Sequence, residues 1–188
     1  MDNQNYQHMF SIPIFHFKID DWIEKKKHLL ETWNLIKEDC VEENNMLISY
    51  GTEKCPEKLD DIIHNCFKEE IAHFLSHLNY HNYTFLNGWF QRASKCGFHG
   101  VHNHGPLGYS SVCFVNYNEY EHTPTTFISP FPDFIMGDTI LYQPNNITEG
   151  SIIFFPSSIQ HFTEPNSSSL ERLIVSFNLA IDYRTVSV

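Results

Sequence analysis

The first eighty residues change from a strand-like pattern to a helical one. Residues 12–19, IPIFHFKI, are β-branched and aromatic, which is typical of a strand. In residues 22–38 apolar side chains return every three or four positions after two acidic residues, which predicts an amphipathic helix. A broader apolar stripe predicts a second helix over about 58–78. We therefore expect a helical layer within about 20–80.

From about residue 82 the pattern becomes that of short strands. These segments are rich in Val, Ile, Phe and Tyr and are separated by Gly, Pro, Asn and Asp. They cover residues 84–93, 108–117, 137–143, 149–158 and 171–181. Strands grouped after helices, instead of alternating with them, disfavour a parallel sheet. We predict a mainly β (α+β) fold, in which a small barrel or sandwich of residues 84–182 carries two amino-terminal helices packed on its outside.

Length and charge limit the function classes. The 188 residues suit one domain, and no linker or repeat divides them. Asp and Glu number 23 against 12 Lys and Arg, and the net charge of -11 argues against binding to a nucleic-acid backbone or an anionic membrane. No apolar run is long enough to span a bilayer, and five cysteines without a CxxC pair predict free thiols. We expect a protein of the cytoplasm, either of a cell or of an infected host. The sequence is compatible with a homodimer.

Histidine is unusually frequent, with 12 residues in the chain, and three of these lie within residues 98–104. On a strand, His102 and His104 point to the same face, so both imidazoles can reach one ion. That pair alone fits a metal site and a structural role about equally well. His161 follows 57 residues after His104, and this separation lets a later barrel strand return beside the first. The three histidines together are a candidate metal site.

The last predicted strand has an unusual polar face. Its apolar face is typical of a core, while a buried arginine on the other face needs a polar partner or costs several kcal/mol. The guanidinium of Arg172 could hold a ligand carboxylate by two parallel hydrogen bonds. The alternative is a salt bridge to Glu171 or Glu164. The polar face comprises Arg172, Ile174, Ser176 and Asn178, and the apolar face Leu173, Val175, Phe177 and Leu179.

These residues, taken in order, resemble the 2-oxoglutarate/Fe(II) oxygenases found in bacteria and marine phages. The resemblance covers about residues 85–182 and implies a double-stranded β-helix, or jelly-roll barrel. It also implies ferrous iron as cofactor and 2-oxoglutarate as cosubstrate, which is decarboxylated to succinate while oxygen is activated. The motifs that carry it are Trp89, the HxH of residues 102–104, SSVCFV at 110–115, GSIIFFPS at 150–157, His161, Glu171-Arg172 and Ser176-Phe177-Asn178.

The resemblance assigns roles residue by residue. His102 and His161 correspond to the two histidine ligands, and Arg172 to the residue that pairs with the far carboxylate of 2-oxoglutarate. His104 departs from the family, because an Asp or Glu usually stands there. Either the metal has three histidine ligands, which strand parity favours, or His104 points aside and water takes the position. Further candidates are Tyr109, Ser176 and Asn178 for the cosubstrate and Trp89 and Arg92 for the substrate.

Two other functions fit the same residues. One is a cupin-like dioxygenase with three histidine ligands and no keto acid, and the other is a non-catalytic jelly-roll module that binds a metal. A closed structural zinc site has four ligands, whereas three are found here. The substrate, a small molecule or a side chain, is not indicated. The Pro- and aromatic-rich residues 118–137 are the expected specificity loop, in which His122 is not expected to bind metal.

Overall fold

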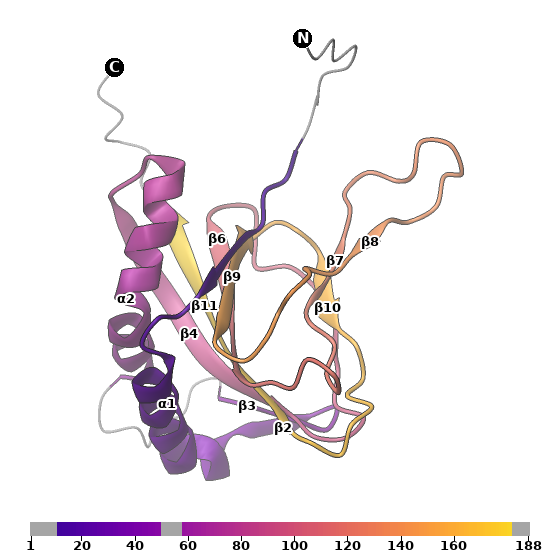
Figure 1. Cartoon of the computed structure of the whole chain (residues 1–188). Coiled ribbons are helices and arrows are strands. Elements are labelled where there is room, and N and C mark those ends of the chain that lie inside the picture. Colours follow the sequence, from indigo (N-terminus) through magenta and orange to yellow (C-terminus); the bar gives the residue numbers. More distant parts are fainter. Residues whose placement is uncertain (1–10, 50–57, 182–188) are drawn as a thin grey trace.

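The computed structural model describes residues 11–49 and 58–181, and two helices form one side of the molecule (Figure 1). Helix α1 is Trp22–Ile36, followed by a single 3-10 turn at Lys37–Asp39, and helix α2 is Leu59–Leu78. Both predicted helices are confirmed. Helix α2 is capped by Asn79, which has a left-handed backbone conformation and whose N–H donates to carbonyls of the last turn.

Eleven strands of the described residues form two antiparallel sheets. The seven-stranded sheet has the order β1-β9-β6-β11-β4-β3-β2, and the four-stranded sheet has the order β5-β10-β7-β8. This is the predicted mainly β fold, a double-stranded β-helix with its helices outside. The strands are β1 Phe15–Lys18, β2 Val41–Glu43, β3 Met46–Ile48, β4 Tyr83–Ala93, β5 His99–His102, β6 Tyr109–Asn116, β7 Thr126–Ile128, β8 Leu141–Tyr142, β9 Ser151–Pro156, β10 His161–Thr163 and β11 Arg172–Ile181.

Strand β11 separates two apolar cores. Its residues Leu173, Val175, Phe177 and Leu179 pack with α1 and α2 against the outer face of the seven-stranded sheet. Ile174 points the other way and packs with Phe127 of β7 between the two sheets. The alternation predicted for residues 171–181 is therefore confirmed, and the polar face of this strand points into the barrel.

Several predicted boundaries are corrected. The first strand is shorter than 12–19, and β8 occupies only two of residues 137–143. The expected loop 118–137 contains β7, and the chain between β7 and β8 projects far from the barrel (Figure 1). Residue 182, the predicted end of the barrel, lies outside the described residues. None of the described helices is long and apolar enough to cross a membrane.

Candidate metal centre

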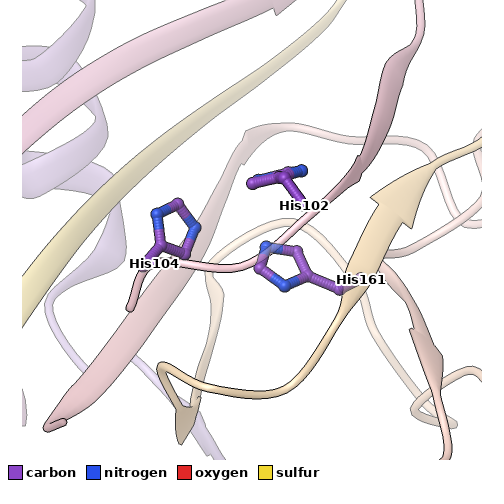
Figure 2. Close-up of side chains that lie close together, drawn as sticks. All are labelled: His102, His104 and His161. Carbon is purple, nitrogen blue, oxygen red and sulfur yellow. The ribbon is translucent and has the colours of Figure 1, made fainter. Parts of the chain in front are cut away.

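Three histidines converge between the sheets. Strands β5 and β10 are antiparallel neighbours, and their register places His161 directly opposite His102. One nitrogen from each of His102, His104 and His161 lies within 4.8 Å of the others, and Figure 2 shows the three side chains gathered around one space. Within residues 11–49 and 58–181 no other three His, Cys, Asp or Glu residues gather in this way.

His104 reaches this cluster by a different route from the one predicted. Strand β5 ends at His102, so strand parity does not place the two rings together. Instead, the backbone N–H of His104 donates to the carbonyl of Ser157 at 2.9 Å, and its ring lies 5.3 Å from that of Trp89. Gly105, with φ 103°, then turns the chain away. A loop fastened to the end of β9 positions the third imidazole.

Two backbone carbonyls fix the tautomers of the strand histidines. Nδ1 of His102 lies 2.8 Å from the carbonyl oxygen of Gly100, and Nδ1 of His161 lies 3.0 Å from that of Ile159. A carbonyl oxygen can only accept, so each Nδ1 carries the proton and each Nε2 keeps its lone pair. Such a hydrogen bond is the usual support of a histidine that ligates a metal.

Burial keeps the imidazoles of the site neutral. It lowers the pKa of His104 to about 4 and that of His161 to about 3, with smaller contributions from the neighbouring histidines. Burial also lowers the pKa of His102. Neutral imidazole is the form that binds a metal. The three residues are therefore ready as ligands at neutral pH.

A fourth histidine, His99, also lines the site, although no sequence pattern assigned it a role. Its ring stacks on that of His102 at a centroid distance of 4.0 Å. Burial lowers its pKa to about 4. The space among the histidines is about 20 Å³, enough for an ion or one water molecule. The other lining residues are Trp89, Gln91, Val112, Thr125, Thr163, Ile174 and Ser176.

Arg172 lies on the same face of β11 as Ile174 and Ser176, which line the site. Its side chain is only 3% exposed, Nη1 donates to the carbonyl of Thr123 at 2.8 Å, and Nη2 has no hydrogen-bond partner in the described chain. The salt bridge considered as an alternative is not formed, because Glu171 pairs with Arg92 at 3.1 Å. Burial lowers the pKa of Arg172, Tyr117 and Glu164 act against this shift, and Glu164 forms no ion pair with Arg172 in the described residues.

The remaining predicted residues divide between the two faces of the large sheet. Trp89 and Ser176 line the histidine site. Asn178 points inward too, but its amide already donates to Asn87 at 2.9 Å and accepts from Ser110 at 2.7 Å. Its side chain therefore braces the barrel.

Two of the predicted contacts are not supported. Tyr109 packs edge-on against Phe74 of α2 at 5.0 Å, on the helix side of the sheet. Arg92 alternates with Gln91, which lines the site, and is held by Glu171 instead. Because both residues lie one strand position away from an inward-facing residue, alternation sends them to the outer face. His122 is not a ligand candidate, as expected, since Nδ1 accepts from Asn118 and Nε2 lies 3.1 Å from the carbonyl of Leu170.

The metal-free protein should lose stability as the pH falls from about 6.5 to about 4. The folded-state pKa values of His104 and His161 lie below the ordinary value of 6.5, so the unfolded chain binds more protons in this window. Urea unfolding at pH 7, 5.5 and 4.5 should show a falling free energy of unfolding. His161→Gln should reduce that slope, and an unchanged slope would contradict the assignment.

One protein family and several solved structures are similar to this chain. Residues 87–178 match the sequence profile of the family described as "Putative 2OG-Fe(II) oxygenase". No curated protein sequence matches the chain.

Solved structures share the fold at low sequence identity. The viral collagen prolyl hydroxylase of Paramecium bursaria Chlorella virus-1, in complex with 2-oxoglutarate, is 15% identical with a TM-score of 0.55, over 88% of this chain and 95% of that one. A Pseudomonas putida prolyl-4-hydroxylase is 13% identical with a TM-score of 0.55, over 90% and 93%. HygX from Streptomyces hygroscopicus, with nickel, 2-oxoglutarate and hygromycin B bound, is 12% identical with a TM-score of 0.62, over 92% and 84%. These likenesses establish the fold, and residues 87–178, just under half of the chain, are similar to the family described as "Putative 2OG-Fe(II) oxygenase".

Proposed function

We propose that the protein is a 2-oxoglutarate- and Fe(II)-dependent oxygenase that hydroxylates a carbon of its substrate. In this reaction a C–H bond becomes C–OH. One atom of O₂ enters the substrate, and the other enters the succinate formed as 2-oxoglutarate loses CO₂. The observation that carries the proposal is the cluster of three neutral histidines together with the buried Arg172, whose Nη2 has no hydrogen-bond partner in the described chain and which shares a face of β11 with two residues that line the site.

The histidines fit a ferrous ion. His102, His104 and His161 would hold it from one side, with Nε2 of His102 and His161 presented by the carbonyls behind them. Iron supplies the activation of oxygen, as in oxygenases with two histidines and one carboxylate. Here an imidazole replaces the carboxylate, so the protein contributes one negative charge less. The anionic cosubstrate then balances more of the metal's charge.

Arg172 fits the far carboxylate of 2-oxoglutarate. A buried guanidinium without a counter-ion costs several kcal/mol, and its free Nη2 together with Nη1 suits a carboxylate. The Cα atoms of Arg172 and Ile174, on the same face of β11, are about 7 Å apart at the usual strand rise. We propose that a five-carbon dicarboxylate bound beside the histidines extends along this face to the guanidinium. Because the space among the histidines is only about 20 Å³, lining side chains such as Thr125 and Ile174 must move to admit it.

The substrate is proposed only as a small molecule or a side chain. The loop prediction for residues 118–137 now applies to the projecting chain between β7 and β8. Strand β7 places Phe127 with its ring 5.8 Å from that of His161, so this chain begins close to the candidate metal. Specificity from this segment remains a prediction.

One specific observation favours a second function. Three histidines without a carboxylate also suit a cupin-like dioxygenase that needs no keto acid, or a metal-binding module without activity. The test is anaerobic addition of Fe(II) and then 2-oxoglutarate, followed by visible spectroscopy. We expect a metal-to-ligand charge-transfer band that appears only with both. Fe(II) binding without this band would contradict the use of 2-oxoglutarate. It would favour a three-histidine centre that uses no keto acid, either the cupin-like dioxygenase or the metal-binding module without activity.

A further inference from the structure

The pairing of β5 with β10 contains an irregularity beside the metal centre. His102 is paired with His161 and His99 with Thr163, so three steps along β5 match two steps along β10. On a regular strand, residues three apart point to opposite faces. The extra residue of this bulge turns His99 to the inner side, where it lines the histidine site together with His102.

The stack between the two rings is close and nearly parallel. The ring centroids of His99 and His102 are 4.0 Å apart, with an interplanar angle of 28°. The other ring contacts among the four histidines of the site have centroid distances of 4.3 to 5.1 Å. The backbone N–H of His99 donates to Oγ1 of Thr163 at 2.9 Å, which fastens the bulge to β10. The backbone that carries the stacked ring of His99 is therefore held in place by a hydrogen bond.

His102 needs such support more than His161 does. Strand β5 is an edge strand of its sheet, and Val101, the residue before His102, is 57% exposed. One hydrogen bond, from Nδ1 to the Gly100 carbonyl, holds the ring at a single point and leaves its plane to be fixed by other contacts. By contrast, His161 is buried between Phe127 and Phe155, with ring centroids 5.8 and 4.8 Å away.

His99 does not belong to the ligand set. The three nitrogens within 4.8 Å of one another come from His102, His104 and His161, and no fourth residue of the described chain joins them. We infer that His99 is a positioning residue, whose ring stacks on His102 and holds Nε2 of His102 toward the metal. This inference rests on the proposed function only in requiring that the three histidines bind a metal. It does not depend on 2-oxoglutarate.

Shape and nitrogen chemistry can be separated by two substitutions. His99→Phe keeps a flat ring for stacking and removes both nitrogens, whereas His99→Ala removes the ring. The probe is Co(II) alone, with its affinity measured by calorimetry and its visible d–d spectrum recorded for each variant. His28, an exposed residue of α1, provides the control His28→Ala.

We expect His99→Ala to weaken Co(II) binding about 10- to 100-fold, the range found when supports of metal ligands are removed, and to alter the d–d spectrum. His99→Phe and His28→Ala should bind within about threefold of the wild type with an unchanged spectrum. Thermal unfolding of the metal-free variants shows whether each one is folded.

Two results would overturn the positioning role. If His99→Phe loses as much affinity as His99→Ala, a nitrogen of His99 acts and not its stacked ring. If both variants bind Co(II) like the wild type, the stack has no role in metal binding. Failure of the wild type to bind Co(II) is a different result, because it removes the three-histidine centre and the proposed function with it.

Discussion

His161→Ala should reduce the rate of 2-oxoglutarate turnover at least a thousandfold and weaken Fe(II) binding by more than a hundredfold. His161 is the most buried ligand candidate, its tautomer is set by the Ile159 carbonyl, and it stands opposite His102 across two paired strands. Removing it leaves two imidazoles, one at the end of β5 and one on the loop that follows, and metal affinity depends on the number of ligands. Succinate formation and anaerobic calorimetry with Fe(II) measure the two effects, with His28→Ala as the control.

The same measurements decide the role of His104. If it is a third ligand, His104→Ala should also lose most of its Fe(II) affinity. His104→Asp should retain metal binding, because it restores the usual carboxylate with its charge. If water takes the third position instead, His104→Ala will bind Fe(II) like the wild type, and the three-histidine centre is wrong.

Arg172→Ala should raise the KM for 2-oxoglutarate roughly a hundredfold and leave Fe(II) affinity within about threefold. A buried, doubly hydrogen-bonded carboxylate partner contributes about 2–4 kcal/mol, and each 1.4 kcal/mol is a factor of ten. Arg172→Lys keeps the positive charge but loses the planar fork, so its KM should lie between those of the wild type and Arg172→Ala.

Arg92→Ala is the matched control for this prediction. Arg92 is paired with Glu171 on the helix side of the sheet, so its loss should leave the KM for 2-oxoglutarate unchanged. Steady-state kinetics with increasing 2-oxoglutarate compares the three variants. An unchanged KM in Arg172→Ala would show that this guanidinium does not bind the cosubstrate.

The sequence allowed prediction of the features that depend on local periodicity. The two helices, the long strands and the alternating faces of β11 follow from patterns of ten or more residues. Strands β2, β3 and β7 have only three residues each and exist because of their pairing partners, so no local pattern marks them.

The site was predicted in part for the same reason. His102, His104 and His161 come together, but His104 does so through the Ser157 carbonyl after its strand has ended. His99 was missed because the bulge depends on the register with β10, more than sixty residues farther along the chain. A count of alternating positions in the sequence contains no information about that register.

The central claim is that three histidines and Arg172 bind one metal and one keto acid together. The most direct measurement is a crystal structure of the protein grown without oxygen in the presence of Fe(II) and 2-oxoglutarate. The predicted result is one metal ion bound by His102, His104 and His161, with the keto acid on the metal and its far carboxylate on Arg172. A metal ion that leaves His104 unbound, or a keto acid that does not reach Arg172, would contradict the claim.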